Sequence, residues 1–272
     1  MTREPDDLDR LVARVLASGK YRALTPAVVR AIGAQELAAR GSLKAAIKAT
    51  RGRLHQIASA FLERTPPYAA WLTALREATG DEERLRAICL EALRQHASTR
   101  ERLPDLERFY PAIFAALPPV SSVMDLACGL NPLAAPWMPL APGTRYLACD
   151  VYTDLSAFLA TALPLLGLNG ASSVCDLSDA APPWRADVAL LLKTLPLLEH
   201  LRRGAGPDLL RRIDAPYLVV SFPTRSLGGR NVGMAATYSA QMRTIAASAG
   251  WPLQQLEFAS EIVFVVRKGG AE

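Results

Sequence analysis

Apolar residues recur every three or four positions through the first part of the chain, a spacing typical of amphipathic helices that bury one face. Thr25-Pro26 is a helix start signal, because a capping hydroxyl precedes a proline at the first helical position. Turns rich in glycine and proline separate the segments, and Pro118-Pro119 ends the pattern. The predicted helices cover residues 8–16, 28–37, 43–61, 68–78, 85–93 and 106–117.

From residue 120 onward the pattern changes to short apolar runs that alternate with helical segments. The runs at 120–127, 146–150, 172–177, 188–193 and 217–222 are predicted strands, and the helices lie near 153–166, 197–213 and 234–249. Continuous apolar strands alternating with helices favour a parallel sheet that is covered on both faces. Residues 253–259 and 262–266 leave no room for a helix between them, so they predict an antiparallel pair at the sheet edge.

These patterns predict an α/β, Rossmann-like fold with a mostly parallel seven-stranded sheet, preceded by an all-helical domain. We place the helical domain at residues 1–117 and the sheet domain at residues 118–272. In such sheets the ligand binds beyond the carboxyl ends of the strands. The residues that follow each strand are therefore the ones to inspect for chemistry.

The charge of the chain is unevenly distributed. Its formal net charge is +5, and residues 1–117 carry the whole excess, because 118–272 hold equal numbers of acids and bases. Between Lys20 and Arg53 stand eight basic residues and a single acid, Glu36. A polyanionic partner is the first hypothesis for this segment, and a solvated helix face is the alternative.

The four cysteines stand at positions 89, 128, 149 and 175, and no two of them have the CxxC spacing of a metal site. We expect them to be reduced and buried in a cytoplasmic protein, with no bound metal. The polar, acidic start of the chain predicts no signal peptide. The longest uncharged apolar run, 155–175, contains Pro164 and two glycines, so we expect no membrane span there.

Three features follow the first three strands in order. Asp125 opens a turn that contains Gly129, the second strand ends at Asp150, and the third ends at Asp176. A glycine lets the backbone approach a ligand closely, and an acid about 20 residues later accepts hydrogen bonds from ribose hydroxyls. A full GxGxxG phosphate grip is absent from the sequence. This set fits a cofactor that has adenosine but no phosphate, which is S-adenosylmethionine.

Two longer motifs carry a resemblance to a known family. The nonapeptide His96–Pro104 (HASTRERLP) and the run Ser221–Gly229 (SFPTRSLGG) resemble those of the aminoglycoside-resistance 16S ribosomal RNA methyltransferases. The likeness extends from about residue 20 to 268 and is closer to the forms that protect antibiotic-producing bacteria. It implies a class I methyltransferase that moves a methyl group from S-adenosylmethionine to N7 of guanine 1405 in the decoding site of the 30S subunit. The helical domain 1–117 would then dock on RNA.

The resemblance implies a cofactor site. Arg102 is expected to hold the methionine carboxylate, since a guanidinium can grip a carboxylate with two parallel bonds. The alternative is a surface arginine paired with Glu101 or Asp105. Asp150 would bind the ribose, and Asp176 with Leu177 the adenine. The remaining predicted cofactor residues are Phe61, His96, Ala97, Ser98, Ala127, Gly129 and Leu192.

The resemblance also implies a target site. N7 of guanine carries a free lone pair, so transfer needs alignment and charge stabilisation rather than a general base. The predicted target-positioning residues are Lys193, Glu199, Arg230 and Glu261. Glu199 could instead cap a helix or belong to an ion pair, and Arg230 could be an exposed loop arginine. The predicted RNA-binding residues are Lys20, Arg22, Lys44, Lys48, Arg51, Arg53, Arg225 and Arg230.

Other functions stay open at this point. Methylation of N1 of an adenine in the same rRNA helix is a second enzyme hypothesis, and a non-catalytic ribosome assembly factor is a third. Methylation of a small molecule would leave the basic segment unexplained. We expect a cytoplasmic monomer with neither DNA nor a membrane as partner, and the resemblance implies that it acts on the 30S subunit or its 16S rRNA.

Overall fold

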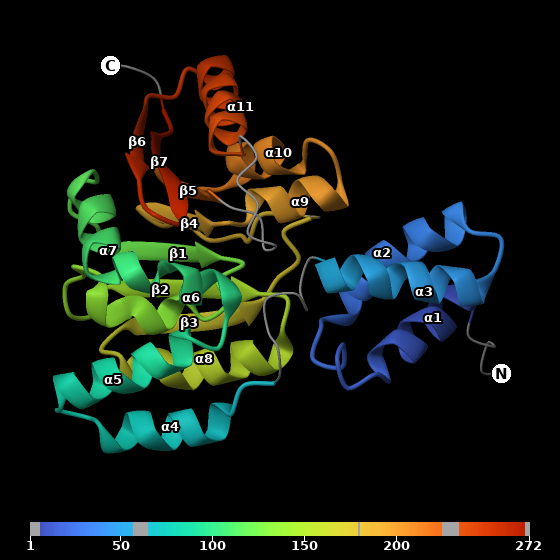
Figure 1. Cartoon of the computed structure of the whole chain (residues 1–272), viewed down its shortest axis with the longest axis horizontal. Helices are drawn as coiled ribbons and strands as arrows, with labels where there is room; N and C mark the ends of the chain where they lie inside the picture. The colour runs from blue at the N-terminus through green and yellow to red at the C-terminus, as the bar shows by residue number, and fades with distance from the viewer. Residues whose placement is uncertain (1–5, 57–64, 179, 225–233, 270–272) are drawn as a thin grey trace.

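A computed structural model of the chain describes residues 6–56, 65–178, 180–224 and 234–269, and a seven-stranded sheet forms its centre (Figure 1). The strand order is β3-β2-β1-β4-β5-β7-β6. The first five strands run parallel, and β7 is antiparallel to both β5 and β6. The predicted mostly parallel sheet with an antiparallel end is therefore confirmed. The strands are β1 Ser122–Leu126, β2 Arg145–Asp150, β3 Asn169–Val174, β4 Val188–Leu192, β5 Tyr217–Pro223, β6 Leu253–Glu257 and β7 Glu261–Arg267.

Helices cover both faces of the sheet, and each face has its own apolar core. On one face pack α4 Tyr68–Glu77, α5 Glu82–Leu93, α7 Leu106–Ala115 and α8 Thr153–Leu165. On the other pack α9 Leu195–Leu201, α10 Ala205–Arg212 and α11 Met234–Ala249. The short helix α6 Ala97–Arg102, the 3-10 turn Leu103–Asp105 and the 3-10 segment Asn131–Trp137 complete the first side.

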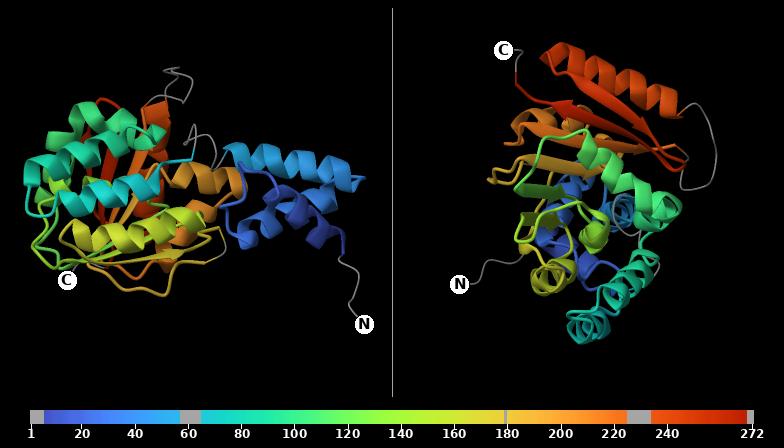
Figure 2. Two further views of the ribbon diagram at one scale, coloured as in Figure 1. Left: turned by 90° about the horizontal axis from the view of Figure 1, so that it is seen from below. Right: turned by 90° about the vertical axis from the view of Figure 1, so that its left-hand side faces the viewer.

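Three N-terminal helices form a separate unit with a third core (Figures 1 and 2). They are α1 Asp7–Leu16, α2 Pro26–Ala39 and α3 Leu43–Leu54. Asp6 caps α1 by accepting a hydrogen bond from the backbone of Asp9 at 2.8 Å. Helices α4, α5 and α7 instead share the core of the sheet. The boundary between the cores therefore falls between Leu54 and Tyr68, whereas the predicted domain boundary is at residue 117.

Two predicted elements differ from the structure for local reasons. The helix expected at 197–213 is divided into α9 and α10, because Gly204 adopts a left-handed conformation with φ 82° between them. The strand expected at 172–177 begins and ends three residues earlier. There Gly170 lies against the Leu163 side chain, and a Cβ at this glycine would come 2.5 Å from the Cβ of Leu163. The serines of this strand gave little apolar signal to locate it.

The structure corrects the prediction of four reduced cysteines. Cys149, in β2, and Cys175, just after β3, form a disulfide with their Cα atoms 5.8 Å apart. Pairing of β2 with β3 brings the two residues together across 26 positions of sequence. Cys89 and Cys128 are free and buried, as expected. Among the described residues no helix is both long and apolar enough to cross a bilayer.

Candidate active site

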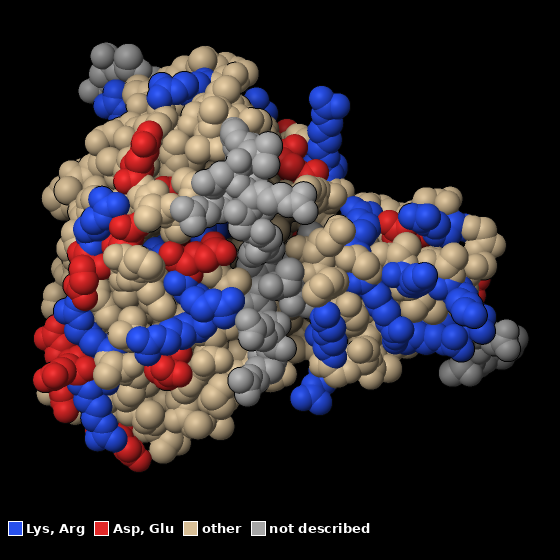
Figure 3. Space-filling view, viewed as in Figure 1, with Lys and Arg blue, Asp and Glu red and all other residues tan. Residues whose placement is uncertain are grey.

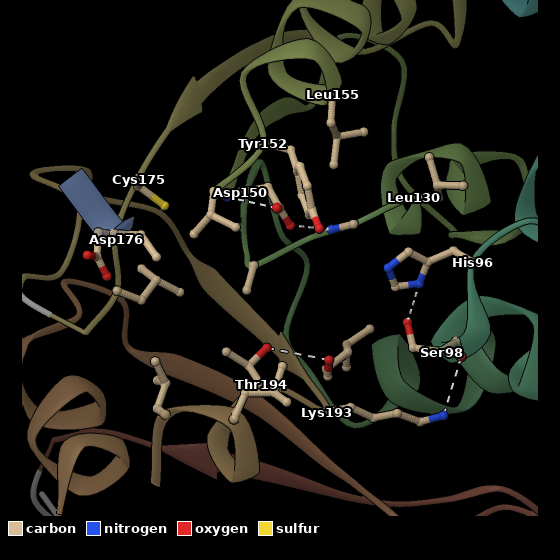
Figure 4. Close-up of a pocket in the computed structure, with 18 of the residues that line it drawn as sticks. His96, Ser98, Leu130, Asp150, Tyr152, Leu155, Cys175, Asp176, Lys193 and Thr194 are labelled. Atoms are coloured by element: carbon tan, nitrogen blue, oxygen red, sulfur yellow. Dashed lines mark hydrogen bonds between the residues drawn. The ribbon is translucent and has the colours of Figure 1, made fainter. Parts of the chain in front are cut away.

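A cleft opens beyond the carboxyl ends of the parallel strands (Figure 4). Its volume is about 970 Å³ when the open solvent at its mouth is included. Asp150 and Asp176 lie toward one end of this cleft, and His96 and Ser98 lie toward the other (Figure 4). The predicted site residues that line it are His96, Ser98, Ala127, Gly129, Asp150, Asp176, Leu177, Leu192 and Lys193.

Asp150 is fixed by the backbone around it. Its carboxylate accepts hydrogen bonds from the N–H groups of Gly129 at 2.8 Å and Val151 at 2.7 Å. Burial raises the pKa of Asp150, and these N–H bonds oppose the rise. Asp176 lies on the next strand end, where its Oδ1 accepts from the backbone and hydroxyl of Ser178. Both acids therefore have defined orientations and remaining lone pairs.

Gly129 is required by geometry as well as by the turn. Its φ of 50° lies in the left-handed region, and a Cβ there would come 3.0 Å from Nε2 of His96. Ala127 takes a similar strained φ of 51° without being glycine. Strained backbone of this kind concentrates at functional sites.

His96 is a neutral polar group in this cleft. Burial, helped by the positive charges of Arg102 and Lys193, lowers the pKa of His96 to about 3. Nδ1 of His96 and the hydroxyl of Ser98 are 2.9 Å apart, at the start of α6. This end of the cleft therefore offers neutral hydrogen-bonding groups with cations close behind them.

Lys193 is held in a strained conformation at the end of β4. Its φ is 60°, and its side chain is only 6% exposed. Nζ donates to the Glu101 carboxylate at 2.6 Å and to the Ser98 carbonyl at 3.3 Å, and lies 3.5 Å from Glu261. The ammonium group thus bridges α6 and β7 while its residue lines the cleft.

Arg102 and Glu261 form a fully buried ion pair across the site. Nε and Nη2 of Arg102 donate to the two carboxylate oxygens of Glu261 at 2.8 and 3.1 Å. Glu261 also accepts from the hydroxyl of Ser221 at 2.6 Å. Burial alone would raise the pKa of Glu261, but Arg102 and Lys193 hold it below its usual value. The alternative of a surface arginine paired with Glu101 or Asp105 is wrong, because Arg102 is 2% exposed.

The other side of Arg102 is also occupied. Nη1 donates to Tyr110 at 3.1 Å and to the side-chain oxygen of Asn131 at 2.7 Å. The amide nitrogen of Asn131 donates in turn to Asp125, which also accepts from Tyr146. Burial raises the pKa of Asp125 to about 6, although these two bonds oppose the rise. One hydrogen-bond network therefore connects β1 and β2 with α6, α7 and β7.

Some predicted residues lie elsewhere. Both carboxylate oxygens of Glu199 accept backbone N–H groups, from Gly204 and Gly206 at 2.9 Å, so this residue caps α10 as its alternative interpretation proposed. Ala97 is buried in α6 and, like Arg102 and Glu261, is not among the residues lining the cleft. Phe61, Arg225 and Arg230 lie outside the described residues.

Sequence reasoning missed several cleft residues, most of them apolar, and one of them, Val28, comes from the N-terminal unit. Their signal was weak, because a valine or leucine beside a cleft looks like any core residue. Tyr152 could have been found, since it follows the acid at the end of β2. The missed residues are Val28, Tyr68, Leu130, Val151, Tyr152, Leu155, Cys175, Thr194, Leu197, Leu198 and Leu201.

The predicted RNA-binding residues of the N-terminal unit divide into those whose side chains have no partner within the described part of the chain and those whose side chains have one. Arg22, Lys44 and Lys48 are exposed and have no partner among the described residues. Lys20 contacts His55 at 3.0 Å. Arg51 and Arg53 are half-buried; Arg51 donates to the Arg14 carbonyl and Arg53 to Glu36, Gln35 and the Leu201 carbonyl. Figure 3 shows lysine and arginine side chains gathered over this unit.

Comparisons with known proteins agree with this geometry. The family described as "Ribosomal RNA methyltransferase (FmrO)" matches residues 17–265. This chain belongs to that family. It is 46% identical to a 16S rRNA (guanine(1405)-N(7))-methyltransferase of Frankia casuarinae over 96% of this chain and 94% of the relative. It is 43% identical to the like-named protein of Micromonospora echinospora over 98% and 99%.

A solved structure supports the same placement. The crystal structure of the 16S rRNA methyltransferase RmtF in complex with S-adenosyl-L-homocysteine is 32% identical, with a TM-score of 0.82. The match covers 98% of this chain and all of RmtF. The class I methyltransferase fold of the sheet domain is therefore confirmed. Among the described residues no group of three or more potential metal ligands comes together.

Proposed function

We propose that this protein transfers a methyl group from S-adenosylmethionine to N7 of guanine 1405 of 16S rRNA. The observation that carries the proposal is the end-to-end match to relatives named for that reaction, in a chain whose cleft holds the predicted cofactor acids. The nearly complete coverage of both chains means that the helical unit and the sheet domain are matched together.

The residues present suit the two ends of this cofactor. Asp150 and Asp176 have fixed carboxylates at one end, where they would accept from the ribose hydroxyls and the adenine amine. His96 and Ser98 provide neutral polar groups at the other end, toward the methionine part. The bound cofactor supplies an electrophilic methyl group on a sulfonium.

Arg102 has a narrower role than its motif suggested. Four of its five N–H groups are spent on Glu261, Tyr110 and Asn131. One N–H of Nη2 has no partner among the described residues. At most one N–H of Arg102 is therefore left for the methionine carboxylate while the Glu261 pair stays closed, and a bidentate grip would require that pair to open.

Catalysis here is a matter of positioning. N7 attacks with its own lone pair, so this chain has to expose the base, align it and balance the charge as the sulfonium loses its methyl group. Lys193 lies at the cleft with a restrained ammonium group and is the residue we assign to the target side. Glu261 is fully buried, so we assign it to holding Arg102 and Lys193 rather than to touching guanine.

The substrate explains the exposed cations. N7 faces the deep, narrow major groove of A-form RNA, so the base must be extracted or the helix distorted before transfer. Such a target is recognised through shape and phosphates, to which Arg22, Lys44 and Lys48 would bind. We infer that the monomer acts in the cytoplasm on the assembled 30S subunit. A methyl group and positive charge at this site would exclude 4,6-disubstituted deoxystreptamines such as gentamicin and kanamycin.

The test uses purified protein, labelled S-adenosylmethionine and either 30S subunits or naked 16S rRNA. N7-methylguanine is then mapped by borohydride reduction and aniline scission. We expect one cleavage, at guanine 1405, in the 30S sample. Label on an adenine, on another guanine or on no RNA would overturn the proposal.

A further inference from the structure

The N-terminal helical unit meets the rest of the protein at the rim of the cleft. Leu24 and Tyr152 form an isolated antiparallel β-bridge, and the backbone N–H of Thr25 donates to the Val151 carbonyl at 2.9 Å. The N–H of Thr153 donates back to the Ala23 carbonyl at 2.8 Å. Val151 directly follows Asp150 and bonds its carboxylate. These contacts therefore hold the loop that orients Asp150, the residue predicted to bind the ribose of the cofactor.

A second contact joins the helical unit to α9, another element that lines the cleft. Nη2 of Arg53, in α3, donates to the carbonyl of Leu201 at 3.0 Å, at the end of α9. Leu197, Leu198 and Leu201 of that helix line the cleft. Arg53 is also paired with Glu36 at 3.3 Å, so its guanidinium is anchored on both sides. Because its guanidinium donates to Glu36 and to the Leu201 carbonyl, Arg53 connects the helical unit to α9 of the sheet domain.

The unit also reaches the cleft itself. Val28, on α2, lines the cleft and is 3% exposed. Its neighbour Val29 is 0% exposed in the same N-terminal core but does not line the cleft. One helix therefore supplies both an internal core residue and a wall residue, next to each other in sequence.

We propose that the α1–α3 unit contributes to the wall of the cofactor cleft through Val28 and that cofactor binding and RNA docking are thereby coupled. The coupling rests on the function proposed above. A cofactor in the cleft would contact Val28 and restrain residues 150–153 and α9. These two segments hydrogen-bond to the helical unit. Ordering these segments in advance reduces the entropy that RNA docking must lose, so each ligand should tighten the other by the same factor.

The wall is tested without RNA, by calorimetric titration of S-adenosylhomocysteine into the full chain. Val28→Ala should weaken binding about fivefold or more, whereas Val29→Ala, which empties a similar volume of the same core, should leave it unchanged. Arg53→Gln should weaken it, whereas Arg30→Gln, which removes the same side chain from an exposed position of the same helical unit, should not. Urea titration of each variant reports stability separately. Equal affinities within both pairs would overturn the wall.

The coupling is tested with wild-type protein and 30S subunits, with and without saturating S-adenosylhomocysteine. We expect 30S affinity to rise at least fivefold with the ligand, and by less in Arg53→Gln. The same 30S affinity in both conditions would overturn the coupling. If the protein binds S-adenosylhomocysteine but no 30S subunit, the proposed substrate fails, while the first titrations still decide the wall.

Discussion

Cationic side chains serve opposite purposes in two regions of this molecule. On the outer helices, Lys44 and Lys48 face solvent with no partner among the described residues. Behind the cleft, Arg102 and Lys193 are 2% and 6% exposed, and each pairs with a carboxylate. A solvated charge needs no partner and stays available for phosphate, whereas a desolvated charge must be compensated within the fold. Charge count alone does not separate these roles; burial does.

The largest expected effect comes from breaking the buried pair. Glu261→Gln leaves Arg102 and Lys193 without their shared carboxylate, so we expect a loss of about 3–5 kcal/mol in the free energy of unfolding. Glu77→Gln is the matched control, because Glu77 pairs with Arg84 at the surface and is 58% exposed. It should change stability by about 0.5 kcal/mol or less. Similar urea midpoints for the two variants would remove the distinction between the regions.

The next effect concerns the disulfide beside Asp150. Reducing Cys149–Cys175 releases a constraint over 26 residues, and we expect a loss of about 2–4 kcal/mol in unfolding free energy. Urea unfolding with and without dithiothreitol measures it. The double variant Cys149→Ser/Cys175→Ser should unfold alike in both conditions. If the wild-type protein is equally stable with and without dithiothreitol, the disulfide contributes nothing to the free energy of unfolding.

A smaller effect should appear as pH falls. The pKa of His96 is lowered to about 3 in the folded state, against an ordinary value of 6.5. Below pH 6.5 the histidine is protonated in the unfolded chain but stays neutral in the folded protein. Protonation therefore favours the unfolded state, and stability falls as the pH falls. Between pH 7.5 and 5 we expect a loss of about 2 kcal/mol attributable to His96.

The measurement compares wild type with His96→Gln at each pH. The comparison is needed because the raised pKa of Asp125 acts in the opposite direction, giving stability as pH falls through about 6. Subtracting the variant leaves the histidine contribution. A difference curve that is flat from pH 7.5 to 5 would show that His96 is not kept neutral by its surroundings.

The smallest expected effect is at the exposed cations. Lys44→Glu/Lys48→Glu should lower 30S affinity about tenfold and flatten its dependence on salt, because fewer counterions are released. Arg76→Glu/Arg267→Glu reverses the same number of exposed charges outside this unit, on α4 and β7, and should change neither quantity. Filter binding at several salt concentrations reports both. Equal losses for the two variants would mean that net charge, rather than the helical unit, attracts RNA.

The sequence predicted what local pattern can show. Helix α11 has the expected bounds, and Asp150 and Asp176 lie at strand ends on one cleft because parallel strands end together. It did not predict the Arg102–Glu261 pair, whose members are 159 positions apart, or the disulfide, which depends on strand register. A charged residue carries no mark of its later burial. Val28 was missed because its apolar side chain serves a core and a cleft at once.

The most direct test of this division is a pair of titrations on two variants. S-adenosylhomocysteine and 30S subunits are each titrated against Arg102→Lys and against Lys44→Glu/Lys48→Glu. We predict that Arg102→Lys weakens S-adenosylhomocysteine binding by a larger factor than it weakens 30S binding. Lys44→Glu/Lys48→Glu should weaken 30S binding and leave S-adenosylhomocysteine affinity unchanged. If both variants lose the same ligand to the same extent, the buried and exposed cations do not have separate functions.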